Sequence, residues 1–232
     1  MIEYGMPTLV ECDGIDECAE LCHRLGLKFI EINQSFPQYQ PANMDITHLQ
    51  ELKDTYGIGY SIHMDESMNP FDFNEKVARV YRENAVEAIE FAKKLDIKKL
   101  NLHLLRGVYV TLPGKRIFLN DVYEEEYLNK VSTFRDACER AIGDSGIKIC
   151  LENTDDPFMP CHHKAMEILL KSPAFGLTLD TGHDQASNHV DLPFFKKNKD
   201  LLCHIHLHNC KGKSPHLPLG EGDVNVNAML DL

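Results

Sequence analysis

The sequence lacks any run of apolar residues close to the roughly 20 that a membrane-spanning helix needs. Its first segment, MIEYGMPTLVECDG, carries acids where a secretory signal would carry lysine or arginine. We therefore expect a cytoplasmic protein that does not enter a membrane.

Pairs of cysteines at the CxxC spacing are absent too, although the chain holds 8 cysteines. Cys18 and Cys22 would share one face of a helix, which is poor geometry for a disulfide. Cys150 and Cys203 lie inside apolar strand patterns. The pattern favours reduced, mostly buried thiols, as cytoplasmic proteins have.

Basic residues are in deficit, with 24 lysines and arginines against 36 acids and a net charge of −12. Such a balance repels polyanions such as DNA or an anionic membrane surface. Nucleic acid is therefore an unlikely partner, although a local groove for it is not excluded by net charge alone. The 12 histidines are the unusual feature of the composition and call for an explanation.

What is present is one unit repeated along the chain, an apolar strand pattern followed by an amphipathic helix pattern. The strand patterns cover residues 3–9, 28–33, 59–64, 98–104, 148–153, 176–181 and 202–209. The helix patterns cover residues 13–25, 45–56, 74–95, 121–142 and 162–171. This order forces a parallel sheet with helices outside it and predicts a (β/α)8 TIM barrel, formed by residues 1–232 as a single domain. The alternative, a doubly wound open sheet, is disfavoured because no glycine-rich phosphate loop follows an early strand.

An eighth strand pattern is missing, since residues 224–232 look like the start of a helix. A seven-stranded barrel would expose two sheet edges, which proteins normally avoid. We expect that the chain is truncated at its C-terminal end. A ligand or a partner chain, such as a second copy in a homo-oligomer, could also cover the gap.

Ionisable groups recur at the carboxyl ends of the predicted strands. Because side chains alternate along a strand, the leucines at 100, 102 and 104 face the helices while His103 faces the interior. The same alternation turns five groups inward at one mouth of the barrel: His63, His103, Glu152, Asp180 and His206. Carboxylates and imidazoles in a barrel interior are costly unless a divalent cation compensates them. Mixed His, Asp and Glu ligation suits Zn²⁺ or Mn²⁺ better than Ca²⁺.

The other histidines have simpler interpretations. His204 and His208, each taken alone, are best interpreted as hydrogen-bonded core residues. His162 and His163 begin a helix, where exposed polar residues are expected. The remaining three look like surface residues: His23, His48 and His189.

Four segments resemble the xylose-isomerase-like TIM-barrel superfamily, which includes sugar and sugar-phosphate isomerases and epimerases and the AP endonuclease family 2 of endonuclease IV type. They are CLENT (150–154), LTLDTGH (177–183), HIHLHN (204–209) and HLPLGEGD (216–223). The resemblance implies that Glu152, Asp180 and His206 are metal ligands and that His183 binds substrate or metal. In the endonuclease branch it implies three further metal ligands: His63, His103 and His216.

Two positions depart from the endonuclease branch. Ser214 stands two residues before His216, where that branch has an aspartate, and a neutral hydroxyl weakens a third metal centre. Glu66 stands three residues after His63, where that branch has an aromatic residue that helps to open the DNA. A carboxylate at this position would repel a phosphodiester backbone.

The resemblance and the charge balance together favour a metal-dependent isomerase or epimerase that acts on a small sugar, sugar phosphate or polyol through an enediolate. Glu152 would be the base, His183 would orient a hydroxyl, and Lys211 could meet a phosphate. The alternative is an endonuclease IV-like phosphodiesterase with a di- or trinuclear zinc site, which the additional histidines support. A barrel that only binds a ligand is the third hypothesis.

Overall fold

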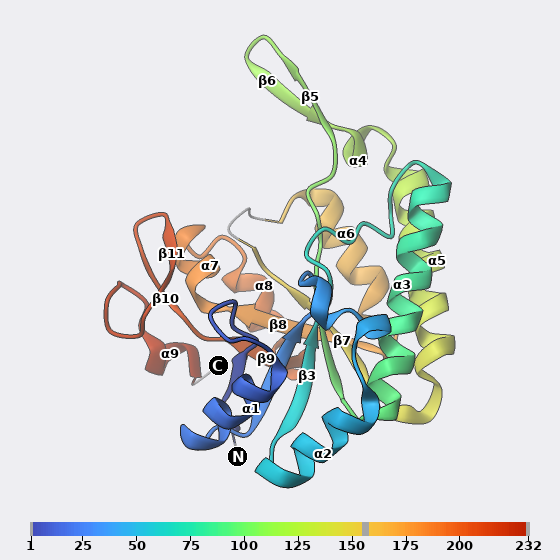
Figure 1. Cartoon of the computed structure of the whole chain (residues 1–232). Coiled ribbons are helices and arrows are strands. Elements are labelled where there is room, and N and C mark those ends of the chain that lie inside the picture. Colours follow the sequence, from blue (N-terminus) through green and yellow to red (C-terminus); the bar gives the residue numbers. More distant parts are fainter. Residues whose placement is uncertain (1, 155–157, 231–232) are drawn as a thin grey trace.

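A curled sheet of seven parallel strands forms the centre of the computed structural model, which describes residues 2–154 and 158–230 (Figure 1). The strands are β1 (Gly5–Pro7), β2 (Phe29–Asn33), β3 (Gly59–His63), β4 (Lys99–His103), β7 (Lys148–Glu152), β8 (Phe175–Asp180) and β9 (Leu202–His206). They pair in this order, and every pair is parallel. The predicted α/β architecture is confirmed, and each predicted strand pattern overlaps one of these strands.

The predicted helices are also present. They are α1 (Ile15–Arg24), α2 (Ile46–Tyr56), α3 (Glu75–Lys94), α5 (Glu124–Ile142) and α6 (Pro160–Leu169), with α9 (Val226–Leu230) near the C-terminal end. Shorter helices are α4 (Leu119–Val122), α7 (Thr181–Ala186) and α8 (Leu192–Lys197), with 3₁₀ turns at Pro37–Tyr39, Pro41–Asn43, Gly143–Ser145 and Lys199–Leu201. α7 and α8 were not predicted, because six residues are too few to show a helical period.

Helix α2 shows how local chemistry sets the boundaries of an element. The Asp45 side chain accepts a hydrogen bond from the Thr47 N–H at 2.8 Å and so caps the first turn. Gly57 ends the helix with a φ of 63°, a left-handed conformation that glycine adopts without steric cost. β3 then begins two residues later, at Gly59.

The sheet is open between its first and last strands. Within residues 2–154 and 158–230 no strand pairs with the free edges of β1 and β9. The molecule therefore has the curled sheet of a TIM barrel without the eighth strand. A cavity of about 1230 Å³ fills the interior and is lined by residues of both edge strands.

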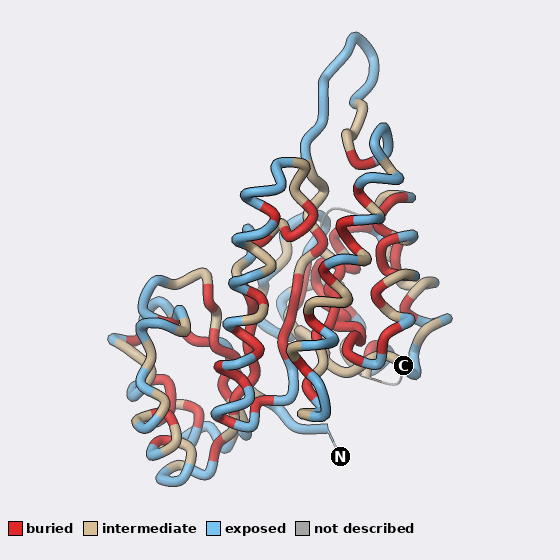
Figure 2. Tube along the Cα trace, turned by 90° about the vertical axis from the view of Figure 1, so that its right-hand side faces the viewer, coloured by how far each residue is buried: buried red, intermediate tan, exposed pale blue. Residues whose placement is uncertain are grey.

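Two antiparallel hairpins, which the sequence did not predict, lie outside the seven-stranded sheet. β5 (Tyr109–Leu112) and β6 (Lys115–Phe118) form an arm that projects from the body and is largely exposed (Figures 1 and 2). β10 (Asn209–Lys211) and β11 (Ser214–Leu217) form the second hairpin directly after β9. The second hairpin folds back over the mouth of the barrel and carries His216.

Buried residues lie along the strands and recur along the helices (Figure 2). All eight cysteines are free thiols, and seven of them are buried, in agreement with the prediction. Among the described residues, no helix combines the length and apolar character needed to cross a bilayer.

The surface interpretation of His162 was wrong. The residue is only 3% exposed, because its Nε2 lies 3.1 Å from the Leu105 carbonyl oxygen of a distant loop. Its Nδ1 accepts the Met159 N–H at 3.3 Å, which leaves Nε2 as the protonated nitrogen that donates to Leu105. Burial lowers the pKa of His162 to about 4. Of the other histidines assigned to the surface, His23 is exposed, whereas His163, His48 and His189 are half-buried.

We expect His162 to reduce stability as the medium becomes acidic. The unfolded chain takes up a proton near pH 6.5, whereas the folded chain resists it until about pH 4. Stability is therefore lost as pH falls through this window, by roughly 3 kcal/mol at its lower end. Glutamine can keep the donor to Leu105 but does not titrate. The free energy of unfolding in urea of the wild type, minus that of His162→Gln, should shrink by this amount between pH 7 and pH 4. Two proteins whose stabilities fall in parallel with pH would show that His162 does not resist protonation in the folded chain.

Candidate metal centre

Glu152 is the point on which the strand ends converge. It is the last residue of β7 and is 1% exposed. Its Oε2 lies 2.9 Å from Nε2 of His103 and 3.6 Å from Nε2 of His63, and it also accepts a hydrogen bond from the Asn101 amide. Its Oε1 lies 2.8 Å from Nδ1 of His206 and 3.8 Å from Nδ1 of His183. Four imidazoles from different elements therefore surround one buried carboxylate.

Asp180 is the second buried carboxylate, 2% exposed, at the end of β8. Its Oδ1 caps α7 by accepting the His183 N–H at 2.7 Å. Its backbone is fixed on the other side by Asn153, whose side chain accepts the Asp180 N–H at 2.8 Å and donates to its carbonyl oxygen at 2.9 Å. The other oxygen, Oδ2, lies 2.8 Å from Nε2 of His208 and 3.8 Å from Nδ1 of His206. It is therefore held beside the Glu152 cluster.

The electrostatics of this cluster favour ionised carboxylates. Burial alone would raise the pKa of Glu152, but the charge of His206 and hydrogen bonds from His103, His206 and His63 hold it well below its usual range. Burial alone would lower the pKa of His206, but Glu152 and Glu31 raise it well above the ordinary value. The buried charges are thus compensated by protons on imidazoles, which is a role that a cation can take over.

The donor set fits a divalent metal ion. Glu152 belongs to two groups of three side chains whose ligand atoms all lie within 4.8 Å of one another, one with His63 and His206 and one with Asp180 and His183. Carboxylates that are only 1% and 2% exposed need a counter-charge, and the mixture of imidazole and carboxylate donors suits Zn²⁺ or Mn²⁺. Any ion at this position would sit at the carboxyl ends of the strands, where TIM barrels place their chemistry.

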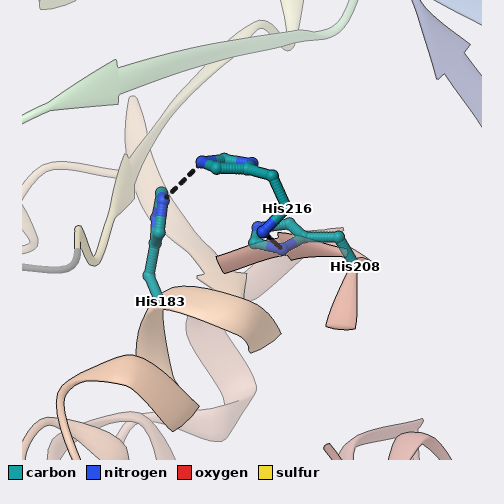
Figure 3. Close-up of side chains that lie close together, drawn as sticks. All are labelled: His183, His208 and His216. Atoms are coloured by element: carbon teal, nitrogen blue, oxygen red, sulfur yellow. Dashed lines mark hydrogen bonds between the residues drawn. The ribbon is translucent and has the colours of Figure 1, made fainter. Parts of the chain in front are cut away.

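Three histidines form a further group at the rim of the mouth (Figure 3). The Nε2 atoms of His183 and His216 face each other at 3.3 Å, and the ring of His208 stacks on that of His216 with centroids 4.3 Å apart. His216 has a φ of 64°, and its N–H donates to Nδ1 of His208 at 2.9 Å, so the turn of the hairpin sets this stack. His208 lies beside His183 and His216 in this group, and Ser214 is not part of it.

The structure brings seven of the eight predicted site residues together. His63, His103, Glu152, Asp180, His183, His206 and His216 all line the one cavity. Lys211 is exposed in the β10–β11 hairpin and is not among the described residues that line it. Glu66 also lines the cavity, where its Oε1 accepts a hydrogen bond from Asn33 at 3.1 Å.

Residues 19–232 match the model of the xylose isomerase-like TIM barrel family, and the curled parallel sheet described above agrees with it. The chain belongs to this family. The match covers everything from within α1 to the end of the sequence, including all the residues of the candidate centre.

This chain is similar to one uncharacterized protein and to solved structures of the same fold. An uncharacterized protein of Methanocaldococcus jannaschii is 32% identical over 200 residues, which are 81% of this chain but only 64% of that protein's length. The crystal structure of a D-tagatose 3-epimerase-like protein has a TM-score of 0.77 at 26% identity and covers 99% of this chain and 85% of its own. The structure of the IOLI protein with a bound zinc atom has a TM-score of 0.74 at 16% identity, covering 99% and 84%, and shows a shared fold.

One inward residue of this xylose isomerase-like barrel was not predicted from the sequence. Glu31 of β2 is 7% exposed and lies 2.9 Å from Nε2 of His204 and 2.8 Å from Nε2 of His206. Asn101 of β4 donates to Glu152. His204 and His208, interpreted as hydrogen-bonded core residues, do have partners, but these partners are carboxylates of the interior, Glu31 and Asp180. The alternation of Glu31 with Ile30 and Ile32 was a signal that could have placed it inside.

Proposed function

We propose that this chain is a divalent-metal-dependent isomerase or epimerase that acts on a small sugar, sugar phosphate or polyol. Glu152, Asp180 and His206 would hold the ion, Zn²⁺ or Mn²⁺, and residues 1–232 would act as one domain. The observation that carries the proposal is the ring of four imidazole nitrogens 2.8–3.8 Å from the Glu152 carboxylate. The likeness to a D-tagatose 3-epimerase-like protein and to a zinc-containing barrel of the same fold supports it.

The residues of this chain would divide the reaction among them. A bound divalent ion supplies Lewis-acid stabilisation of the negative charge that develops on adjacent substrate oxygens. Glu152 is held ionised, and as a carboxylate it can take the carbon-bound proton of the substrate. His183, whose side chain is 11% exposed, would orient a hydroxyl in the cavity. Lys211 lies beyond the cavity, so it would meet a substrate only through a phosphate that extends out of the mouth.

Solvent-deuterium exchange tests this proposal without requiring the true substrate to be known. The chain, loaded with Mn²⁺ or Zn²⁺, would be incubated in D₂O with a panel of ketoses and ketose phosphates. At least one of them should gain deuterium at a carbon next to its carbonyl, and Glu152→Gln should abolish the gain. The absence of exchange with every member of the panel would argue against an isomerase, and binding without exchange would favour a barrel that only holds a ligand.

An endonuclease IV-like phosphodiesterase is the second candidate, and the number of metal-ligating groups favours it. His63 and His103 beside Glu152, together with the group of His183, His208 and His216, offer donors for more than one ion. Hydrolases with two metals hold them about 3.5–4 Å apart around the attacked phosphate. Glu66 in the cavity and the net charge of −12 oppose a DNA substrate.

Metal content and one cleavage assay separate the two candidates. One ion per chain favours the isomerase, and two or three favour the hydrolase. Cleavage of an abasic-site duplex that is lost in His103→Ala and on chelation would overturn the isomerase proposal.

A further inference from the structure

Glu31 lies behind the candidate metal centre, on the far side of the His206 ring from Glu152. The two nitrogens of His206 face two different carboxylates, Nδ1 toward Oε1 of Glu152 at 2.8 Å and Nε2 toward Oε1 of Glu31 at 2.8 Å. Glu152 comes from β7 and shares its ligand groups with His63, Asp180 and His183, whereas Glu31 comes from β2 and is grouped only with His204 and His206 among the described residues. The ring is therefore held between a candidate ligand and a second carboxylate.

Glu31 is itself fixed by neighbours that leave one oxygen for His206. Its Oε2 lies 2.9 Å from Nε2 of His204 and accepts a hydrogen bond from the Ser61 hydroxyl at 3.1 Å. Its side chain is 9% exposed, so a charge at this depth needs these partners. The other carboxylate oxygen of Glu31, Oε1, is the one that lies 2.8 Å from Nε2 of His206. The carboxylate is anchored from one side and points its other oxygen at the imidazole.

Nε2 of His206 needs a hydrogen-bond acceptor. The atom is buried, and among the described residues it makes no aligned hydrogen bond, although Glu31 lies within contact distance. An imidazole that ligates a metal ion through Nδ1 must carry its proton on Nε2, and a buried N–H without an acceptor is costly. Histidine ligands in metal sites are generally oriented by a carboxylate or carbonyl on the other nitrogen.

We propose that Glu31, anchored by His204 and Ser61, is the positioning residue that holds His206 with Nδ1 toward the metal ion. The inference rests on the proposed metal-dependent function and adds a residue that touches neither the ion nor the substrate. The anchor explains why His204 precedes His206 in the same strand with the same inward orientation. It also accounts for a buried carboxylate in β2, a strand that carries none of the proposed ligands.

Binding of Zn²⁺ to the full chain tests the proposal. Glu31→Gln keeps the size of the side chain and removes the charge, and the Zn²⁺ dissociation constant should rise by about 10- to 100-fold. Glu66→Gln makes the same chemical change in the same cavity, at a residue that contacts Asn33 rather than His206, and its affinity should stay close to that of the wild type. A purely structural role for Glu31 would instead lower the melting temperature of the metal-free variant and leave the affinity of the folded protein unchanged, which would overturn the proposal.

A measurement on the wild type covers the case in which Glu31→Gln does not fold. In the Zn²⁺-loaded protein, ¹⁵N NMR of the His206 ring should show a protonated Nε2 and a metal-bound Nδ1. An unprotonated Nε2, or a second Zn²⁺ ion bound by Glu31 and His204, would overturn the inference. A wild type that binds no ion would overturn the proposed function together with it, whereas equal affinities in wild type and Glu31→Gln would overturn the positioning role alone.

Discussion

Replacing Glu152 by glutamine is expected to reduce ketose turnover by a factor of about 10²–10⁴, the range that a lost acid–base group commonly costs. The substitution preserves the shape of the side chain but removes a charge that four imidazoles share within 2.8–3.8 Å. The same change weakens the donor set for the ion, so metal affinity should fall together with kcat/KM. Steady-state kinetics and calorimetric titration of Mn²⁺ or Zn²⁺ measure the two losses separately.

Glu66→Gln is the matched control for this substitution. Glu66 lines the same cavity and would undergo the same chemical change, but it contacts Asn33 rather than the histidine cluster. Its metal affinity and turnover should remain near those of the wild type. A Glu152→Gln protein that still binds the ion and turns over substrate would place the chemistry elsewhere in the cavity.

Much of the fold and of this centre follows from one regularity in the sequence. Parallel strands alternate their side chains and end at one edge of the sheet, so strand-end residues such as His63, Glu152 and Asp180 had to converge once the strands were recognised. Glu31 was missed although the same alternation applies to it. It sits in the middle of β2, and its role depends on the last strand of the sheet, which only the curl of the sheet brings near.

The parts that could not be predicted depend on contacts between distant segments. His208 joins His183 and His216 only because the β10–β11 hairpin turns back over the mouth, and a left-handed residue at 216 gave no sign of this in the sequence. The His162 side chain contacts the Leu105 carbonyl oxygen, 57 positions earlier in the chain, and the helical period of the sequence does not reveal such a contact. The β5–β6 arm did leave a local signal, a Pro113–Gly114 turn between two strand-like segments, with Gly114 at a φ of 79°.

Metal loading should produce the largest change in stability. An ion that binds the folded chain and not the unfolded one, at about 1,000 times its dissociation constant, adds about 4 kcal/mol to the free energy of unfolding. For a chain of this size that corresponds to a rise in melting temperature of roughly 8–16 °C. The donors come from β3, β7, β8 and β9, so the unfolded chain has no comparable site. Scanning calorimetry with Zn²⁺ or Mn²⁺, followed by chelation, measures the rise and its reversal.

The increase in melting temperature on metal binding should itself depend on pH. The ionisation of His206 beside Glu152 determines in which direction it changes. In the metal-free protein the pKa of His206 is raised, so its contribution to stability is complete below the unfolded value near 6.5 and is lost as pH increases through the folded value. An ion must displace that proton, so its affinity falls as the medium becomes acidic. The increment in melting temperature should therefore grow between pH 6 and pH 8 and be nearly absent in Glu152→Gln. An increment that is independent of pH, or equal in Glu152→Gln, would mean that the ion binds outside this centre.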